Sequence, residues 1–149
     1  MTFGAVPVMA QEVKKPVDYR QFDNFESYQD IGYDQAYRPL FHFTSKKNWI
    51  NDPNGLVYYD GEYHLFFQHN PLGMGWGNMI WGHAVSTDMV HWKQRPHAIK
   101  PYGKGYIFSG TGVVDHNNSL GKQVGSTKTL VFMYSYALDE RQRFGVLPA

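Results

Sequence analysis

The run Trp49-Ile50-Asn51-Asp52-Pro53-Asn54-Gly55 combines a carboxylate, two amides and a stiffened backbone within seven residues. The proline fixes its own φ, and amide side chains can hydrogen-bond to sugar hydroxyls, so Asp52 can be held toward a substrate atom. The same residue types are also the ordinary residues of a turn. The run therefore allows two interpretations, a turn or a site built around Asp52.

The residues that follow predict a β-hairpin that would carry this run. Asp60-Gly61 is a typical two-residue hairpin turn, and the segments on either side of it are rich in aromatic and aliphatic residues. Counting outward from the turn places Pro53 opposite Gln68. Asp52 and Gln68 are therefore expected to emerge together at the open end of the hairpin.

Two tryptophans follow the hairpin in Gly75-Trp76-Gly77-Asn78-Met79-Ile80-Trp81-Gly82-His83. An indole face can stack on the C–H surface of a sugar, and glycine neighbours leave that face open. Trp76 and Trp81 are thus candidates for the walls of a sugar site.

The pattern of strands predicts an all-β fold. Short aromatic and β-branched segments are separated by Gly, Pro, Asn and Asp, and no long helix is indicated. The expected strands are Leu40–Phe43, Leu56–Tyr59, Tyr63–Gln68, Ile80–Ser86, Trp92–Gln94, Gly112–Val114 and Thr129–Tyr136. The segment 55–67 is echoed by 112–133, and such a repeat of nearly sixty residues indicates about two blades of a β-propeller.

Composition excludes several classes of partner and chemistry. The 149 residues carry a formal charge of +1 with no long basic run, so nucleic acid is not expected as a partner. No apolar segment has the length of a membrane span. Cysteine is absent, which excludes thiolate catalysis and disulfides, and the seven scattered histidines do not predict a metal site. No cofactor is expected, and the oligomeric state is not readable from the sequence.

Three regions are predicted along the chain. Residues 1–10 end in Val8-Met9-Ala10, which is similar to the end of a signal peptide and predicts a secreted or periplasmic protein. Residues 11–38 mix charged, Tyr and Gln residues without periodicity and predict an extended N-terminal arm. Residues 39–149 are expected to form the folded β domain.

Four motifs together closely resemble glycoside hydrolase family 32, the β-fructosidases that include levanases, inulinases and invertases. They occur in the family's order between Tyr37 and Tyr136, as W-I-N-D-P-N-G, L-F-F-Q-H-N-P, W-G-N-M-I-W-G-H-A and F-S-G-T-G-V-V-D. The resemblance implies the N-terminal part of a five-bladed propeller with its active site in the axial funnel.

The resemblance also implies residue roles. Asp52 matches the nucleophile that forms a covalent fructosyl-enzyme. The expected substrate-binding residues are Asn51, Gln68, Trp76, Trp81, Phe108 and Ser109. The substrate class would be a fructan or sucrose, with an exo-acting fructanase favoured by the Tyr-Tyr-Asp-Gly-Glu-Tyr hairpin.

A retaining glycosidase also needs a second carboxyl group about 5 Å from the first. The family's Arg-Asp-Pro and Glu-Cys motifs, which supply the stabiliser and the acid/base, do not occur here, since Arg95 is followed by Pro96 and cysteine is absent. The expectation is therefore a truncated fructosidase that does not turn over substrate alone. Two alternatives stay open, a non-catalytic sugar-binding fragment and a related five-bladed glycosidase that inverts arabinan or xylan.

Overall fold

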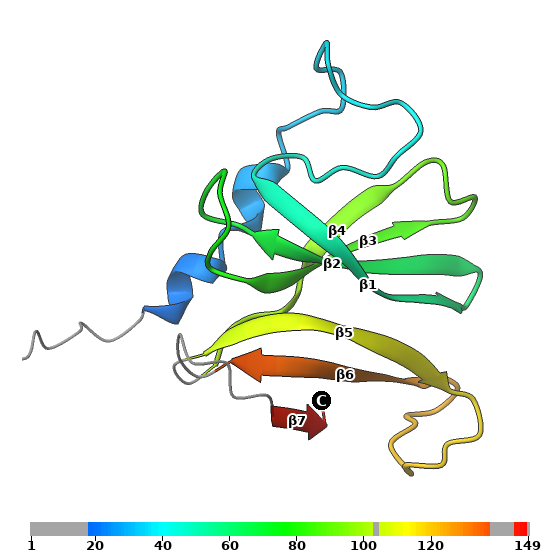
Figure 1. Cartoon of the computed structure of the whole chain (residues 1–149). Helices are drawn as coiled ribbons and strands as arrows, with labels where there is room; N and C mark the ends of the chain where they lie inside the picture. Colours follow the sequence, from blue (N-terminus) through cyan, green and yellow to red (C-terminus); the bar gives the residue numbers. More distant parts are fainter. Residues whose placement is uncertain (1–17, 103–104, 138–144, 149) are drawn as a thin grey trace, which may run out of the picture.

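The strands form two antiparallel sheets stacked against each other (Figure 1). The computed structural model describes residues 18–102, 105–137 and 145–148. The strand order is β1-β2-β3-β4 in the first sheet and β5-β6-β7 in the second, so the all-β prediction is confirmed. The strands are β1 (Trp49–Tyr59), β2 (Glu62–Asn70), β3 (Ile80–Ser86), β4 (Lys93–Ile99), β5 (Tyr106–Asp115), β6 (Thr129–Ala137) and β7 (Gly145–Pro148).

The predicted hairpin is formed by β1 and β2. Tyr59 pairs with Glu62 across the turn, and Asp60 and Gly61 have φ values of 50° and 83°. Two consecutive positive φ values are what a type I′ turn requires, and this turn matches the right-handed twist of the strands. The Asp-Gly turn therefore sets the start of the register, as the sequence predicted.

Further from the turn, the register of β1 departs from simple counting. Pro53 pairs with Phe67 and not with Gln68, because the register shifts between Asn54 and Val57. A second shift follows between Ile50 and Pro53. Both shifts place extra residues on β1, which is how a β-bulge bends a strand and redirects its side chains. The turn-forming residue types of the N-D-P-N-G run are thus accommodated inside a strand.

The hydrophobic core lies between the two sheets. Trp81 and Ile107 are fully buried, and Phe66 packs edge-on against Phe132 of the facing sheet with ring centroids 4.6 Å apart. Large rings from both sheets interdigitate here, which removes apolar surface from water on both faces at once. The buried cluster consists of Val57, Phe66, Trp81, Ile107, Tyr134 and Tyr136.

The first strands of the two sheets lie side by side and run in the same direction. Ser109 bonds to Asp52, and the backbone of Gly112 lies against that of Gly55, so both contacts carry the same offset along the chain. A Cβ added at Gly55 would lie 2.5 Å from the Gly112 nitrogen. Glycine is therefore required at position 55 for the close approach of β1 to β5. These two glycines belong to the repeat noticed in the sequence.

The predicted strand Leu40–Phe43 does not form. Leu40 and Phe41 are 82% and 76% exposed in a loop with no partner strand. Arg38 holds this loop by donating hydrogen bonds to the carbonyls of Ser45 and Lys46 and to the Thr44 hydroxyl. Apolar residues alone thus did not make a strand where no sheet edge was available.

The predicted extended arm is also only partly extended. Its residues 11–17 lie outside the described residues, as do residues 1–10, the predicted signal-peptide remnant. The rest contains two short 3-10 helices, η1 (Tyr19–Phe22) and η2 (Phe25–Tyr28). Phe22 and Tyr28 are buried, and the Tyr28 hydroxyl lies 2.7 Å from Nε2 of His69. Widely spaced aromatic residues anchor this segment, which explains why no helical period was visible in the sequence.

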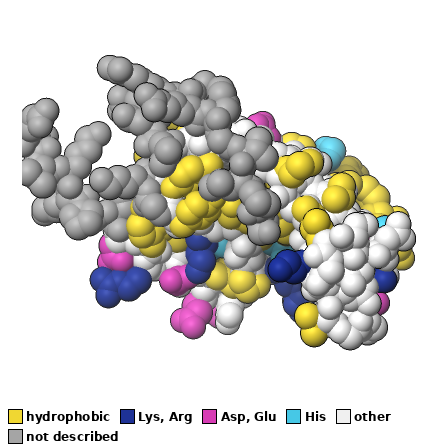
Figure 2. All heavy atoms as spheres, turned by 90° about the horizontal axis from the view of Figure 1, so that it is seen from below, with side chains coloured by type: hydrophobic (Ala, Val, Ile, Leu, Met, Phe, Trp, Pro, Cys, Tyr) yellow, Lys and Arg dark blue, Asp and Glu magenta, His cyan; other side chains and the backbone are white. Residues whose placement is uncertain are grey.

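Figure 2 views the molecule from below, and hydrophobic side chains gather there in several patches of the described part, with Lys, Arg, Asp and Glu side chains between them and along one edge. In the described residues no helix has both the length and the apolar character of a membrane span.

Candidate active site

A cavity of about 320 Å³ opens where β1 and β5 begin, and it contains most of the predicted site residues. Asp52 and Ser109 meet in it directly, since the Ser109 hydroxyl donates a hydrogen bond of 2.8 Å to Oδ2 of Asp52. The lining residues are Asn51, Asp52, Gln68, Trp76, Met79, Phe108, Ser109 and Ser135.

The β-bulge between Ile50 and Pro53 explains how two consecutive residues reach the same cavity. On a regular strand Asn51 and Asp52 would point to opposite faces of the sheet. Both fall in the register shift between Ile50 and Pro53, so neither has a Cα partner on β2, and both line the cavity. The bulge therefore turns the carboxylate and its neighbouring amide toward one space.

Asp52 is the sole carboxylate among the described lining residues, and none of them is a lysine, arginine or histidine. Its side chain is exposed, and its one hydrogen bond within the described chain comes from Ser109. Three of the four oxygen lone-pair positions of a carboxylate are thus left for other partners. The Ser109 hydrogen bond fixes the direction of the carboxyl group, while Oδ1 makes no hydrogen bond within the described chain.

Gln68 is the buried polar group of the cavity. It is 3% exposed, and its Nε2 has no hydrogen-bond partner within the described chain. An unpaired buried amide costs about 1–3 kcal/mol of stability. That cost is offset when a ligand oxygen enters the cavity and accepts the bond, so Gln68 is suited to recognise a polar ligand.

This environment gives a prediction for stability. Gln68→Leu is expected to leave the free energy of unfolding unchanged within about 0.5 kcal/mol or to raise it, because no hydrogen bond is lost. Gln94→Leu is the matched control: Gln94 is 5% exposed, and its Oε1 accepts from the Lys46 backbone N–H at 2.8 Å. It should cost about 2 kcal/mol in urea unfolding. Equal losses for the two variants would contradict this account of Gln68.

Trp81 does not lie where the sequence placed it. It was predicted as a further wall of the sugar pocket, but it is fully buried between the sheets. Its Nε1–H donates a hydrogen bond of 2.9 Å to the Phe108 carbonyl. Burial of the ring and of its N–H fixes the backbone beside Ser109, so Trp81 supports the cavity from behind.

Three contributors to the cavity were missed in the sequence. Met79 and Ser135 line it directly. Asn54 is buried, and its Oδ1 accepts a 3.3 Å hydrogen bond from the Gly110 N–H, which joins β1 to β5 next to Ser109. Met79 and Asn54 belong to motifs already recognised, whereas nothing in the sequence marked Ser135.

The family model for the glycosyl hydrolases family 32 N-terminal domain matches residues 42–145. The chain belongs to glycoside hydrolase family 32. It is 58% identical over 110 residues to a levanase of Bacillus subtilis, covering 74% of this chain and 16% of that protein. It is 50% identical over 110 residues to an extracellular exo-inulinase of Aspergillus awamori, covering 70% of this chain and 20% of that protein.

Solved family 32 structures share the fold of this domain. The crystal structure of the Aspergillus awamori exo-inulinase matches with a TM-score of 0.66 at 47% identity, over 71% of this chain and 22% of that one. A β-fructofuranosidase from Schwanniomyces occidentalis, solved with fructosyl-erythritol, matches with a TM-score of 0.66 at 41% identity, over 75% and 23% of the two chains. The two sheets are thus part of a family 32 β-propeller, and the chain spans about a fifth of the length of these curated relatives.

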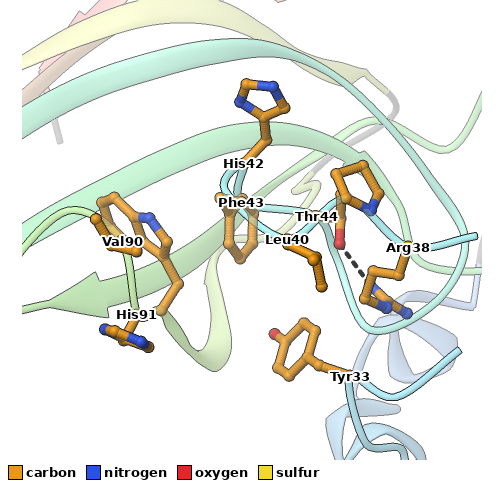
Figure 3. A pocket seen from close by; sticks show the side chains of 10 residues that line it. Tyr33, Arg38, Leu40, His42, Phe43, Thr44, Val90 and His91 are labelled. Atoms are coloured by element: carbon orange, nitrogen blue, oxygen red, sulfur yellow. Dashed lines mark hydrogen bonds between the residues drawn. The ribbon is translucent and has the colours of Figure 1, made fainter.

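The Asp52 cavity is not the largest hollow of this family 32 domain. A larger cavity of about 740 Å³ lies between η2 and β4, and a smaller one of about 270 Å³ lies between the Arg38 loop and the turn before β4 (Figure 3). Figure 3 shows aromatic and aliphatic side chains around the smaller one, with the Arg38 guanidinium turned toward Thr44. None of the predicted site residues lines either hollow.

Proposed function

We propose that this chain carries the nucleophile half of a retaining β-fructosidase site, with Asp52 attacking the anomeric carbon of a terminal fructosyl unit. The observation that supports this most is the meeting of Asp52, Ser109 and the unpaired Gln68 amide in one cavity. A retaining mechanism needs a carboxylate held in a fixed direction at the sugar, and the Ser109 hydrogen bond supplies that direction.

The proposed roles of the other residues follow from their chemistry. The Gln68 amide and the Asn51 side chain would hydrogen-bond to fructosyl hydroxyls, and the Trp76 and Phe108 rings would contact the apolar surface of the sugar. Trp81 would act only by positioning Phe108. The substrate would be a fructan or sucrose, and the similarity to a levanase and an exo-inulinase favours a fructan.

The step assigned to Asp52 is a displacement at the fructosyl C2. An oxygen of the carboxylate forms the new C–O bond while the bond to the leaving oxygen breaks, and that oxygen must receive a proton from an acid. The described part of the cavity holds no second carboxyl group. We therefore expect no release of fructose from sucrose, inulin or levan by this chain on its own.

A trapping experiment tests this proposal without needing the acid. An activated fluorinated fructosyl reagent carries a leaving group that departs without protonation, so a competent nucleophile alone should become labelled. Intact mass spectrometry of the purified chain should show one added fluorofructosyl group, located at Asp52 by peptide mapping. Asp52→Asn should remove the label completely, and Ser109→Ala should slow its formation.

A sugar-binding domain without chemistry is the second candidate, since only one carboxylate lines the described cavity. Binding of fructose without any labelling of Asp52 would favour it over the nucleophile role. The match to family 32 favours both of these over an inverting enzyme that acts on arabinan or xylan.

We also propose that the protein is exported. The support is the small-residue pattern at Val8-Met9-Ala10 together with a relative named as an extracellular exo-inulinase. Fractionation of the native host, with detection of the chain outside the cytoplasm, tests this.

A further inference from the structure

Tyr106 carries the aromatic surface of the cavity outward along β5. Phe108 lines the cavity, whereas Tyr106, two residues earlier at the start of the same strand, does not. Residues two apart on a strand share a face. The two rings are accordingly nearly parallel, with an interplanar angle of 11° and centroids 6.5 Å apart.

Trp76 joins these two rings into one surface. Its indole lies 6.4 Å from the Tyr106 ring and 6.3 Å from the Phe108 ring, measured between centroids. The Trp76 loop is held by Asn70, which is buried and whose Nδ2 donates a 2.7 Å hydrogen bond to the Gly75 carbonyl. The three-ring surface is thus anchored on both sides, by the strand β5 and by the Asn70 loop.

The outer two rings remain accessible. Trp76 is 65% exposed and Tyr106 is 41% exposed, and the Tyr106 hydroxyl makes no hydrogen bond within the described residues. Buried tyrosines normally find a partner for the hydroxyl, and large exposed apolar groups beside a cavity mark a binding surface. Core packing alone does not explain Tyr106, because 41% of the residue stays exposed.

We infer that Tyr106, with Trp76, contacts the second sugar unit of an oligosaccharide whose terminal unit occupies the Asp52 cavity, and so favours fructan chains over short substrates. This inference rests on the proposed function. The geometry supports it because β5 begins at the cavity. Phe108 lines the cavity, and Tyr106, two residues earlier on β5, lies just outside the lining. A sugar linked outward from the cavity would meet the Tyr106 ring next.

Calorimetric titration of the purified chain with fructose and with inulin-type di-, tri- and tetrasaccharides tests this. Tyr106→Ala should weaken binding of the trisaccharide about fivefold and change fructose binding less than about twofold, as expected for loss of one ring contact. Tyr106→Phe should bind both as the wild type does. Tyr58→Ala, which removes a 56% exposed tyrosine on β1, is the matched control and should change neither.

Saturation-transfer NMR reports which sugar unit contacts the protein. A purely structural role of Tyr106 would not change this pattern for one sugar unit alone. Protons of the second sugar unit should receive saturation in the wild type and lose it in Tyr106→Ala, while the terminal unit keeps it. Equal losses for fructose and trisaccharide, or no change in either, would overturn the inference. A wild-type chain that binds fructose but no oligomer more tightly would overturn the inference alone, whereas failure to bind any of these sugars would overturn the proposed function with it.

Discussion

Gly55→Ala is expected to destabilise the domain by about 3 kcal/mol, although it adds only one methyl group. The new Cβ would lie 2.5 Å from the Gly112 nitrogen, 2.9 Å from the Gly112 Cα and 3.1 Å from the Thr111 carbonyl carbon. All three are backbone atoms, so no side chain can rotate away. The clash can be relieved only if β1 and β5 move apart.

This separation would affect the cavity as well as stability. Asp52 and Ser109 lie three residues before Gly55 and Gly112 on the same two strands, and their 2.8 Å hydrogen bond joins those strands. Gly55→Ala should therefore lower the urea midpoint and also slow labelling of Asp52 by the activated fructosyl reagent. The core between the sheets would loosen at the same time, because its rings come from both sheets.

Gly75→Ala is the matched control for this prediction. A Cβ at Gly75 meets no atom within 4 Å, so the variant should unfold within about 0.5 kcal/mol of the wild type. Urea unfolding followed by circular dichroism measures both variants. If Gly55→Ala unfolds at the same urea concentration as Gly75→Ala, the close approach of β1 and β5 does not exist in solution.

The sequence was most informative where local chemistry alone decides the structure. The Asp60-Gly61 turn requires two positive φ values, which few other residue pairs supply, so the hairpin and its first pairs could be predicted. The repeat of Gly55 and Gly112 could likewise be seen, because the close approach of two strands leaves room for no side chain.

Sequence reasoning was less successful where partners distant along the chain decide the outcome. The bulge at Asn51 and Asp52 has no sequence pattern of its own. Counting residues outward from the hairpin turn therefore cannot predict the register beyond it. Trp76 and Trp81 have similar neighbours in the sequence, yet the first is 65% exposed and the second is fully buried. What separates them is the facing sheet, where Phe108, Phe132 and Tyr134 contact Trp81 from 27, 51 and 53 positions further along the chain.

Acidification is expected to destabilise the domain strongly between pH 6.5 and about 4. Burial lowers the pKa of His69 to about 4, of His83 to about 4 and of His97 to about 3, from an ordinary value of 6.5. These rings are neutral in the folded chain and protonate when it unfolds, so the unfolded state binds more protons in this range. Stability is therefore complete above pH 6.5 and is lost as the pH falls toward the folded pKa values.

The hydrogen bonds of His69 agree with a neutral ring. Its Nδ1 lies 2.8 Å from the Trp49 carbonyl, which can only accept, so Nδ1 carries the proton and Nε2 accepts from the Tyr28 hydroxyl at 2.7 Å. A second proton on Nε2 would reverse its hydrogen bond with the Tyr28 hydroxyl and place a charge on a fully buried ring, which is costly without an anionic partner. A pKa lowered by burial from 6.5 to about 4 corresponds to about 3 kcal/mol of stability for this histidine alone, lost in full below pH 4.

His97 offers the sharpest test, because its titration can be removed without removing its hydrogen bond. The ring packs against Phe25, Tyr28 and His69, with the charges of Lys47, Lys100 and Asp23 close by. Its Nε2–H donates to Oδ1 of Asn24 at 3.1 Å, while Nδ1 is buried without a partner among the described residues. A glutamine amide can make the same donation and does not titrate.

His97→Gln should therefore match the wild type at pH 7.5 within about 1 kcal/mol and exceed it at pH 4.5, where the wild-type histidine opposes folding. Urea unfolding at several pH values measures this difference. His116→Gln, which changes an exposed histidine, should leave the slope of stability against pH as in the wild type. If His97→Gln and the wild type lose stability in parallel from pH 6.5 to 4, the buried ring is not what makes this domain sensitive to acid.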